Sequence, residues 1–416
     1  MDAVMKQDES IVLAMVISIG GTPAPIIKSI MHYKPEFVSF LASQDTADNI
    51  ADIKKAASET GFKSEITIVE NVDDLLHCYN KADEAVMRVV KRNYEKDRVI
   101  VDYTGGTKNM SVALSLAAVT HGFSFSYVGG RERTKNGVGI VVDGQEEIYK
   151  SVNPWDFMAV EEKKKIALLF NQNQFKAAKD LVVRLCEKST KYRFLFKKVG
   201  FLIDGYYSWD LFRHGEALDK FKKAKIEEIL ESEDTSFHKF AKESAEKQSF
   251  LEELGKNNKN ISKPLILDLF ANAERRFYEG KYDDSILRLY RLIEMAAQER
   301  LLNQYEIDTS DVKKEQIPDE LRDSFIHSYY DSRENKIQIP QSAAFSLLKS
   351  LGDELGNKFE SNKNQFLKIQ SARNQSYLAH GIKPQKDTAY NDFRNFILQL
   401  EIFQVKDVPE FPKIMV

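Results

Sequence analysis

The feature that most limits how this chain can fold is a change in residue pattern at Asn153-Pro154-Trp155-Asp156. Before this point, short runs rich in Val, Ile and Phe alternate with stretches whose apolar residues recur at helical spacing. After it such runs vanish, and Lys, Glu, Leu and Ala follow at a spacing of about 3.6 residues. We therefore expect an α/β part followed by an all-helical part.

The N-terminal pattern predicts a mainly parallel sheet with helices on both faces, because strands and helices of this length alternate along it. Residues 123–128 and 138–142 are joined by a basic loop that contains glycine, so they should form an antiparallel hairpin at one edge. The expected strands are 11–19, 37–42, 66–69, 99–102, 123–128 and 138–142, and the expected helices are 26–31, 46–60, 72–94 and 109–121.

A length of 416 residues exceeds what one hydrophobic core usually serves, so two or three domains are expected. Segments 170–178, 209–217 and 277–285 each place an aromatic residue shortly before a small residue that opens a new helix, as helical hairpins do. Their uneven spacing does not support a repeat array. The polar stretch 254–263 is the best second boundary. The predicted domains are 1–156, 157–263 and 264–416.

Composition excludes several classes of protein. With 43% hydrophobic and 30% charged residues, the chain resembles neither a disordered protein nor a membrane protein. The apolar run 11–19 is about half as long as a membrane span, and the acidic residues before it do not suit a signal peptide. A net charge of −3 provides no overall attraction to duplex nucleic acid, so any such contact must be local.

The two cysteines, Cys78 and Cys186, lie far apart in helical patterns, so they form neither a disulfide framework nor a zinc site. This fits a reducing cytoplasm. Six of the histidines show no spacing typical of metal ligands. These are His32, His77, His121, His214, His238 and His327. We therefore expect a cytoplasmic protein with no metal and no cofactor.

The sharpest local signal is a buried strand that continues through two glycines into a small-residue helix. It reads Val99-Ile100-Val101-Asp102-Tyr103-Thr104-Gly105-Gly106-Thr107-Lys108. The glycines let the backbone approach a ligand, and the amides at the helix start favour an anion. With the two threonine hydroxyls and the lysine, this suits a phosphate. The spacing matches neither a P-loop nor a dinucleotide fingerprint, which disfavours ATP hydrolysis and NAD chemistry.

Similar loops follow the other predicted strands, at 18–23, 43–46 and 129–131. In a doubly wound sheet all of them meet at the carboxyl edge, where ligands bind. A single such loop is more simply a tight turn, but several loops at one edge favour a ligand site. The candidate residues are Gly20, Gly21, Thr22, Ser43, Gln44, Thr104, Gly105, Gly106, Thr107, Lys108, Gly130 and Arg131.

Three of these segments carry a resemblance to a known family. Asp102-Tyr103-Thr104-Gly105-Gly106-Thr107-Lys108, Gly20-Gly21-Thr22-Pro23 and Asn153-Pro154-Trp155-Asp156 resemble the CARF domain of type III CRISPR accessory proteins, over residues 8–156. The resemblance implies a Rossmann-like, homodimeric sensor that binds a cyclic oligoadenylate across its twofold axis. A ring with an even number of adenylates, such as cyclic tetra- or hexa-adenylate, can present the same phosphates to both subunits. The residues do not reveal the ring size.

A second pattern lies near the C-terminus, where Arg373 and Asn374 precede Tyr377 and His380. Glycine and proline follow shortly, so a helix is expected to end at about His380, with Arg373, Tyr377 and His380 on one face. A histidine can take the proton of a ribose 2′-hydroxyl or donate one to the leaving oxygen, while a guanidinium stabilises the charge on the phosphate. Taken alone, one Arg and one His are more often a surface pair.

In its all-helical context, the spacing Arg373-x(6)-His380 resembles the motif of HEPN ribonucleases, over residues 264–416. The resemblance implies that two protomers form one composite site, with Arg373, Asn374 and His380 as catalytic residues. It also implies cleavage of single-stranded RNA without a metal, leaving a 2′,3′-cyclic phosphate and a 5′-hydroxyl.

An upstream helix, 283–302, places Arg291 and Glu294 beside its buried apolar stripe. They are three residues apart and can pair. A half-buried ion pair that fixes the helix is the expected role, and RNA positioning or support of Arg373 is the alternative. Tyr377 is expected to be a supporting residue of the same site.

These patterns predict a homodimeric endoribonuclease of type III CRISPR antiviral defence that is metal-independent and activated by a cyclic oligoadenylate. The alternative is a non-catalytic cyclic-nucleotide-binding regulator whose helical half recruits a partner protein. A third possibility is that the sensor also cuts its activator slowly, with a hydroxyl such as that of Thr104 or Thr107. RNA base preference and activity on DNA stay open.

Overall fold

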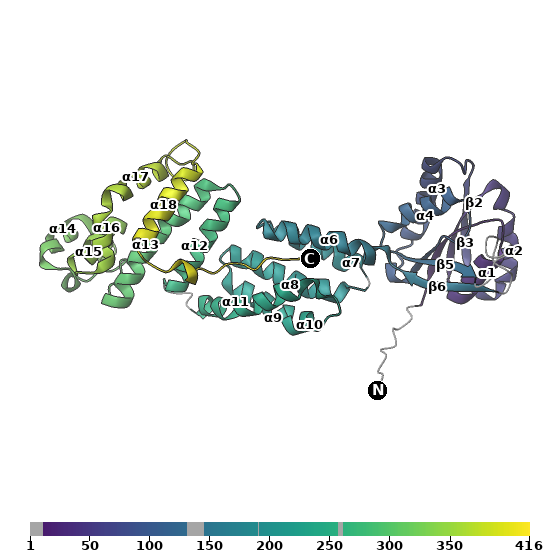
Figure 1. The fold of residues 1–416 in the computed structure, drawn as a ribbon, viewed down its shortest axis with the longest axis horizontal. Helices are drawn as coiled ribbons and strands as arrows, with labels where there is room; N and C mark the ends of the chain where they lie inside the picture. The colour runs from purple at the N-terminus through teal and green to yellow at the C-terminus, as the bar shows by residue number, and fades with distance from the viewer. Residues whose placement is uncertain (1–10, 131–144, 190, 257–260) are drawn as a thin grey trace, which may run out of the picture. The chain divides into compact units, whose positions relative to one another are not determined.

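The computed structural model describes residues 11–130, 145–189, 191–256 and 261–416. The chain separates into two compact units, one of Met1–Lys163 with Leu181–Phe196 and one of Lys164–Asp180 with Lys197–Val416 (Figure 1). The first unit holds the large sheet and the second is built mainly of helices. The finer division into three domains at 156 and 263 stays a prediction.

The described part of the first unit contains a six-stranded sheet with the order β3-β2-β1-β4-β5-β6. Strands β1 to β5 pair in parallel, and β6 pairs antiparallel with β5 at one edge. Their bounds are β1 (Ala14–Ser18), β2 (Phe37–Ser43), β3 (Lys63–Val69), β4 (Val99–Asp102), β5 (Ser124–Gly130) and β6 (Glu146–Val152). The predicted α/β sheet is confirmed. The predicted strand 138–142 lies outside the described residues, and β6 was not foreseen.

Alternate residues of β1 face opposite sides of the sheet, as in any strand. Met15 and Ile17 pack with α1 (Ala24–Tyr33) and α2 (Asn49–Ala56). Ala14 and Val16 pack with α3 (Leu75–Val90) and α4 (Lys108–Val119) (Figure 1). Because helices cover both faces, the strand is apolar throughout. Because both faces are covered, a ligand can reach the sheet only at the ends of its strands.

The change in sequence pattern coincides with the joint between the sheet and the helices. α6 (Pro154–Asn171) begins directly after Asn153, whose side chain accepts a hydrogen bond from the Trp155 amide at 2.9 Å. The side-chain amide of Asn153 donates to the Lys188 carbonyl at 2.8 Å, and the Trp155 indole donates to the Val119 carbonyl at 2.6 Å. These side chains therefore fasten the first helical residues to the end of α4.

Helices dominate from α6 onward, as the sequence predicts. Asn173, Phe212 and Gly280 adopt positive φ in the short turns that close the three predicted hairpins. An antiparallel pair, β7 (Tyr330–Asp331) and β8 (Lys336–Ile337), was not predicted. The helices are α7 (Phe175–Lys188), α8 (Arg193–Asp210), α9 (His214–Ala224), α10 (Ile226–Leu230), α11 (His238–Lys256), α12 (Lys263–Tyr278), α13 (Tyr282–Tyr305), α14 (Asp319–Tyr329), α15 (Gln341–Ser350), α16 (Glu354–Ser361), α17 (Lys363–Asn374) and α18 (Asp387–Gln399).

One hydrophobic core joins α12, α13 and α15 to α18, and α13 packs against α12, α15, α17 and α18. Leu289 and Ile293 of α13 are fully buried in it. The core therefore fixes α13 beside α17, the helix that carries Arg373. Within the described residues, none of the helices combines the length and apolar character that crossing a membrane would require.

Candidate functional site

The carboxyl ends of β1 and β4 lie side by side at the centre of the sheet, because β1 pairs with β2 on one side and β4 on the other. Open α/β sheets bind ligands at such a switch point. The two loops touch through glycine. A Cβ on Gly105 would lie 2.6 Å from the Gly20 nitrogen, and a Cβ on Gly20 would lie 2.9 Å from the Gly106 nitrogen. Only glycine permits this backbone contact.

Thr104 and Thr107, two of the predicted ligand-binding residues, stabilise the backbone at the carboxyl edge of the sheet. Thr107 caps α4 by accepting a hydrogen bond from the Met110 amide at 3.3 Å. The Thr104 hydroxyl accepts one from the Val128 amide of β5 at 2.8 Å. Thr107 and Lys108 are exposed at the start of α4, so they and the free helix amides can face a ligand.

The remaining candidates follow neighbouring strands. Gly21 and Thr22 are exposed beyond β1, and Gln44 is exposed beyond Ser43, which ends β2. Gly130 ends β5. Arg131 lies outside the described residues. Because the order is β2-β1-β4-β5, the candidates that the structure describes gather at one edge of the sheet.

Asp102 is a buried residue of this edge that the candidate residues did not include. Its carboxylate accepts hydrogen bonds from the Ser29 hydroxyl at 2.5 Å and from the Thr104 amide at 2.9 Å. Burial raises the pKa of Asp102, although both hydrogen bonds act in the opposite direction. The only sequence signal is an acidic residue that closes an otherwise apolar strand.

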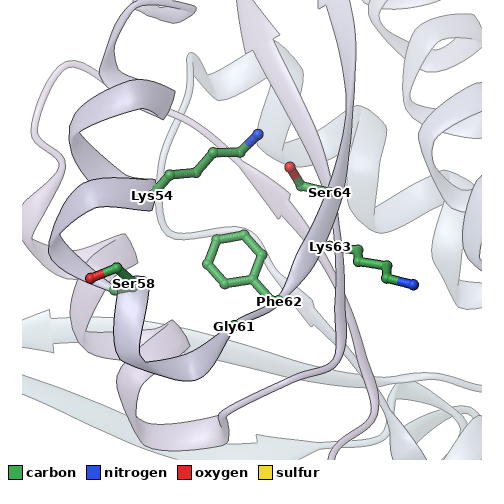
Figure 2. Close-up of a pocket in the computed structure, with 7 residues that line it drawn as sticks. Lys54, Ser58, Gly61, Phe62, Lys63 and Ser64 are labelled. Atoms are coloured by element: carbon green, nitrogen blue, oxygen red, sulfur yellow. The ribbon is translucent and has the colours of Figure 1, made fainter.

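A cavity of about 390 Å³ opens elsewhere in the first unit, between the end of α2 and the start of β3 (Figure 2). Lys54, Phe62 and Ser64 line it. It lies at the amino end of β3, and therefore at the opposite end of the sheet from the loops that carry Gly20 and Gly105, which we call the glycine loops. None of the predicted ligand-binding residues lines it.

The segment between Arg373 and His380 departs from the predicted helix. α17 ends at Asn374, so the prediction that Arg373, Tyr377 and His380 share one helical face is wrong. Beyond Asn374 the Lys383 amide donates to the Gln375 carbonyl at 2.9 Å, in place of a helical bond. We call residues 375–385 the histidine loop.

Arg373 remains in the last turn of α17 and rests on an aromatic ring. Its guanidinium carbon lies 4.5 Å from the ring centroid of Tyr290 on α13. Its Nη1 donates to Asn374 Oδ1 at 2.9 Å. Its Nε is buried and has no hydrogen-bond partner among the described residues. The Tyr290 hydroxyl accepts a hydrogen bond from Gln370 at 3.2 Å, which holds the ring.

His380 and Tyr377 are exposed on the histidine loop. Tyr377 has 63% of its surface accessible. In the part of the chain that the structure describes, no hydrogen bond to the His380 ring is found. The imidazole is thus reachable by a substrate or by another protein chain.

Arg291 and Glu294 form the expected ion pair, with Nη1 and Oε2 2.7 Å apart and both side chains partly exposed. Arg291 also donates to Gln298 at 3.0 Å. Support of Arg373 by this pair stays a prediction. Among the described residues, no three or more His, Cys, Asp or Glu side chains are grouped so that they could hold a metal ion.

Comparison with known families matches two adjoining parts of the chain. The model of the Csm6 HEPN domain matches residues 254–404, and that of the Csm6 6H domain matches residues 158–251. Together these ranges take in more than half of the chain. The chain belongs to the CARF–HEPN ribonucleases of type III CRISPR systems. The HEPN match contains Arg373, Asn374 and His380.

One solved structure shares the fold of this chain over most of its length. Enterococcus italicus Csm6 bound to cyclic hexa-2'-fluoro-hexa-dAMP has a TM-score of 0.60 at 14% identity, over 94% of this chain and 93% of that one. Can2 from Sulfobacillus thermosulfidooxidans in complex with cyclic tetra-adenylate has a TM-score of 0.25 at 14% identity, over 49% and 68%. No curated protein matches. The predicted Rossmann-like part followed by a helical HEPN part is confirmed.

Proposed function

We propose that this CARF–HEPN protein is a homodimeric endoribonuclease that a cyclic oligoadenylate activates and that cuts single-stranded RNA without a metal, in the cytoplasm, as part of antiviral defence. The observation that carries the proposal is the pair of Arg373 and His380, within the region matched to the HEPN model. His380 is exposed, and Arg373 is held on Tyr290 with Nη1 next to Asn374.

These groups suit transesterification of RNA. The ribose 2′-oxygen bonds to phosphorus while the P–O5′ bond breaks, which leaves a 2′,3′-cyclic phosphate and a 5′-hydroxyl. One imidazole accepts the 2′-hydroxyl proton, and a protonated imidazole donates a proton to O5′. The Arg373 guanidinium stabilises the charge that gathers on the phosphate oxygens. Asn374 orients the guanidinium through its hydrogen bond.

The need for two imidazoles supports a site built from two copies of the chain. The histidine loop carries one histidine, His380, whereas the reaction uses a base on one side of phosphorus and an acid on the other. A twofold axis would set the partner subunit's His380 opposite the first. A dimer would therefore complete a site that one chain leaves half-built.

The activator is proposed to bind at the carboxyl edge of the CARF sheet. The glycine contact brings the loops after β1 and β4 together at this edge, where the start of α4 can face a phosphate and the exposed Lys108 adds a positive charge. Enterococcus italicus Csm6, which shares the fold, was solved with a cyclic hexanucleotide analogue, which supports a cyclic oligoadenylate as the ligand class. The proposal includes slow cleavage of the activator by the sensor, with the hydroxyl of Thr104 or Thr107.

An RNA-cleavage assay with a chelator present tests the proposal. We expect cleavage with cyclic tetra- or hexa-adenylate and none without either. Arg373→Ala or His380→Ala should lower the activated rate by about 100-fold or more, as loss of an acid–base group or a charge-stabilising group usually does.

His327→Ala is the matched control, because His327 is an exposed histidine on α14 of the same HEPN region. It should cut like the parent. Following the activator in the same reactions shows whether linear products form. Parental rates in Arg373→Ala and His380→Ala, or loss of parental cleavage in chelator, would overturn the proposal.

A further inference from the structure

Both ends of the histidine loop are tied to one carboxylate on another helix. Asp283 lies in the first turn of α13, and its Oδ1 accepts a hydrogen bond from the Ser376 hydroxyl. Its Oδ2 accepts one from the Gln385 amide at 3.0 Å. Ser376 is 1% exposed, and Asp283 and Gln385 are partly buried, so both hydrogen bonds are partly shielded from water. A charged acceptor makes such hydrogen bonds stronger than neutral ones.

The loop is also closed on itself between these two anchors. The Gly381 amide donates to the Ser376 carbonyl at 3.1 Å, and the Lys383 amide donates to the Gln375 carbonyl at 2.9 Å. Gly381 lies so close to the first residue of the loop that a Cβ there would be 2.0 Å from the Gln375 carbonyl oxygen. Residue 380 is therefore carried by a short closed turn whose base rests on Asp283.

The same helix supports the other half of the pair. Tyr290, the ring beneath Arg373, lies two helical turns after Asp283 on α13, so both side chains project from one face. The exposed His380 ring has no hydrogen bond of its own in the described chain, so its position follows that of the loop. One face of α13 thus sets where both Arg373 and His380 stand.

We propose that Asp283 is a positioning residue of the ribonuclease: through Ser376 and Gln385 it fixes the histidine loop so that His380 stands at the scissile phosphate beside Arg373. This rests on the proposed function. Asp283 takes no part in the proton transfers. Its effect should therefore be on kcat, because displacing a reacting group by about 1 Å can cost about 100-fold in rate.

The test compares variants of the full chain in the activated RNA-cleavage assay. Asp283→Ala should lower kcat by about 100-fold with an unchanged KM for RNA. Asp283→Asn should fall between Ala and the parent, because its NH2 group cannot accept a hydrogen bond and replaces one of the two carboxylate oxygens that accept from Ser376 and Gln385. Gly381→Ala should resemble Asp283→Ala, because the added methyl group displaces the loop from Gln375.

Asp284→Ala is the matched control. Asp284 is the next residue of α13 and pairs with Arg288 at 2.7 Å. It should keep the parental kcat. Hydrogen exchange gives a readout independent of activity: Asp283→Ala should speed exchange of amides in residues 375–385 and leave those of α12 unchanged.

The outcomes separate this inference from the proposed function. If Arg373→Ala and His380→Ala are inactive while Asp283→Ala keeps the parental kcat, the positioning role is wrong and the proposed function stands. Faster hydrogen exchange in α12 of Asp283→Ala would indicate a general loss of folding. The Gly381→Ala variant then tests the positioning role in its place. If Gly381→Ala speeds hydrogen exchange of the amides in residues 375–385 but leaves kcat unchanged, the inference fails.

Discussion

A single buried carboxyl group, that of Asp102, lies at the centre of the carboxyl edge of the sheet. Asp102 ties α1 to the loop after β4, through Ser29 and the Thr104 amide. Burial raises its pKa above the ordinary value of 3.8. For an acid with a raised pKa in the folded state, the contribution to stability is complete below the ordinary value and is lost as the pH rises through the folded pKa.

Asp102→Asn should therefore gain stability relative to the parent as the pH rises above 3.8, because the amide never has to carry a buried charge. The measurement is the difference in melting temperature between variant and parent, at a pH below 3.8 and at neutral pH. Asp45→Asn, an exposed acid in the loop after β2, is the control and should show little change in this difference. A difference for Asp102→Asn that does not grow with pH would contradict the prediction.

At the scale of whole elements, local pattern was enough wherever neighbours in sequence decide the conformation. β4 spans Val99–Asp102, as predicted, because its apolar run has no competing helical spacing. The convergence of the glycine loops also followed, since parallel strands bring their carboxyl ends to one edge.

The end of α17 could not be foreseen in the same way. The Gly and Pro stop signals suggested a helix to His380, but Asp283, far away in sequence, draws Ser376 out of the helical path. Asp102 was similarly hidden, because its partners lie on a different helix and in the next loop. Long-range contacts of this kind leave little trace in residue spacing.

The C-terminal segment is another element that the sequence pattern did not reveal. The Phe411 ring centroid lies 4.7 Å from that of Tyr206 on α8 and 4.0 Å from the guanidinium carbon of Arg275 on α12. Asn171 exchanges two hydrogen bonds of 2.9 Å with the backbone of Ile414. The segment therefore runs back from the HEPN helices onto α6 and α8.

Phe411→Ala should lower the free energy of unfolding of the second unit by about 3 kcal/mol, the low end for a buried Phe, since the ring is partly exposed. Urea unfolding followed by the fluorescence of the buried Trp209, in a Trp155→Phe background, measures the change. Tyr278→Ala, on α12 of the same unit, removes a ring that is 77% exposed and is the control. Equal urea midpoints for the two variants would show that the segment contributes nothing.

For the molecule as a whole, the central expectation is that one chain does not suffice. The histidine loop offers one imidazole, and the chemistry calls for an acid and a base. A composite site makes cleavage depend on which chains are paired, whereas a site complete within one chain does not. Mixing active and inactive chains distinguishes the two arrangements.

Adding an equal amount of the double variant Arg373→Ala/His380→Ala to a fixed amount of parent, with time for subunits to exchange, should lower the activated rate to about half. Random pairing then places about half of the parental chains opposite an inactive partner, and such pairs lack one of the two imidazoles and one guanidinium. The control is the same mixture assayed before exchange, which should keep the full parental rate. A rate that stays unchanged after exchange, while size measurements show mixed dimers, would mean that each chain cuts RNA with its own Arg373 and His380.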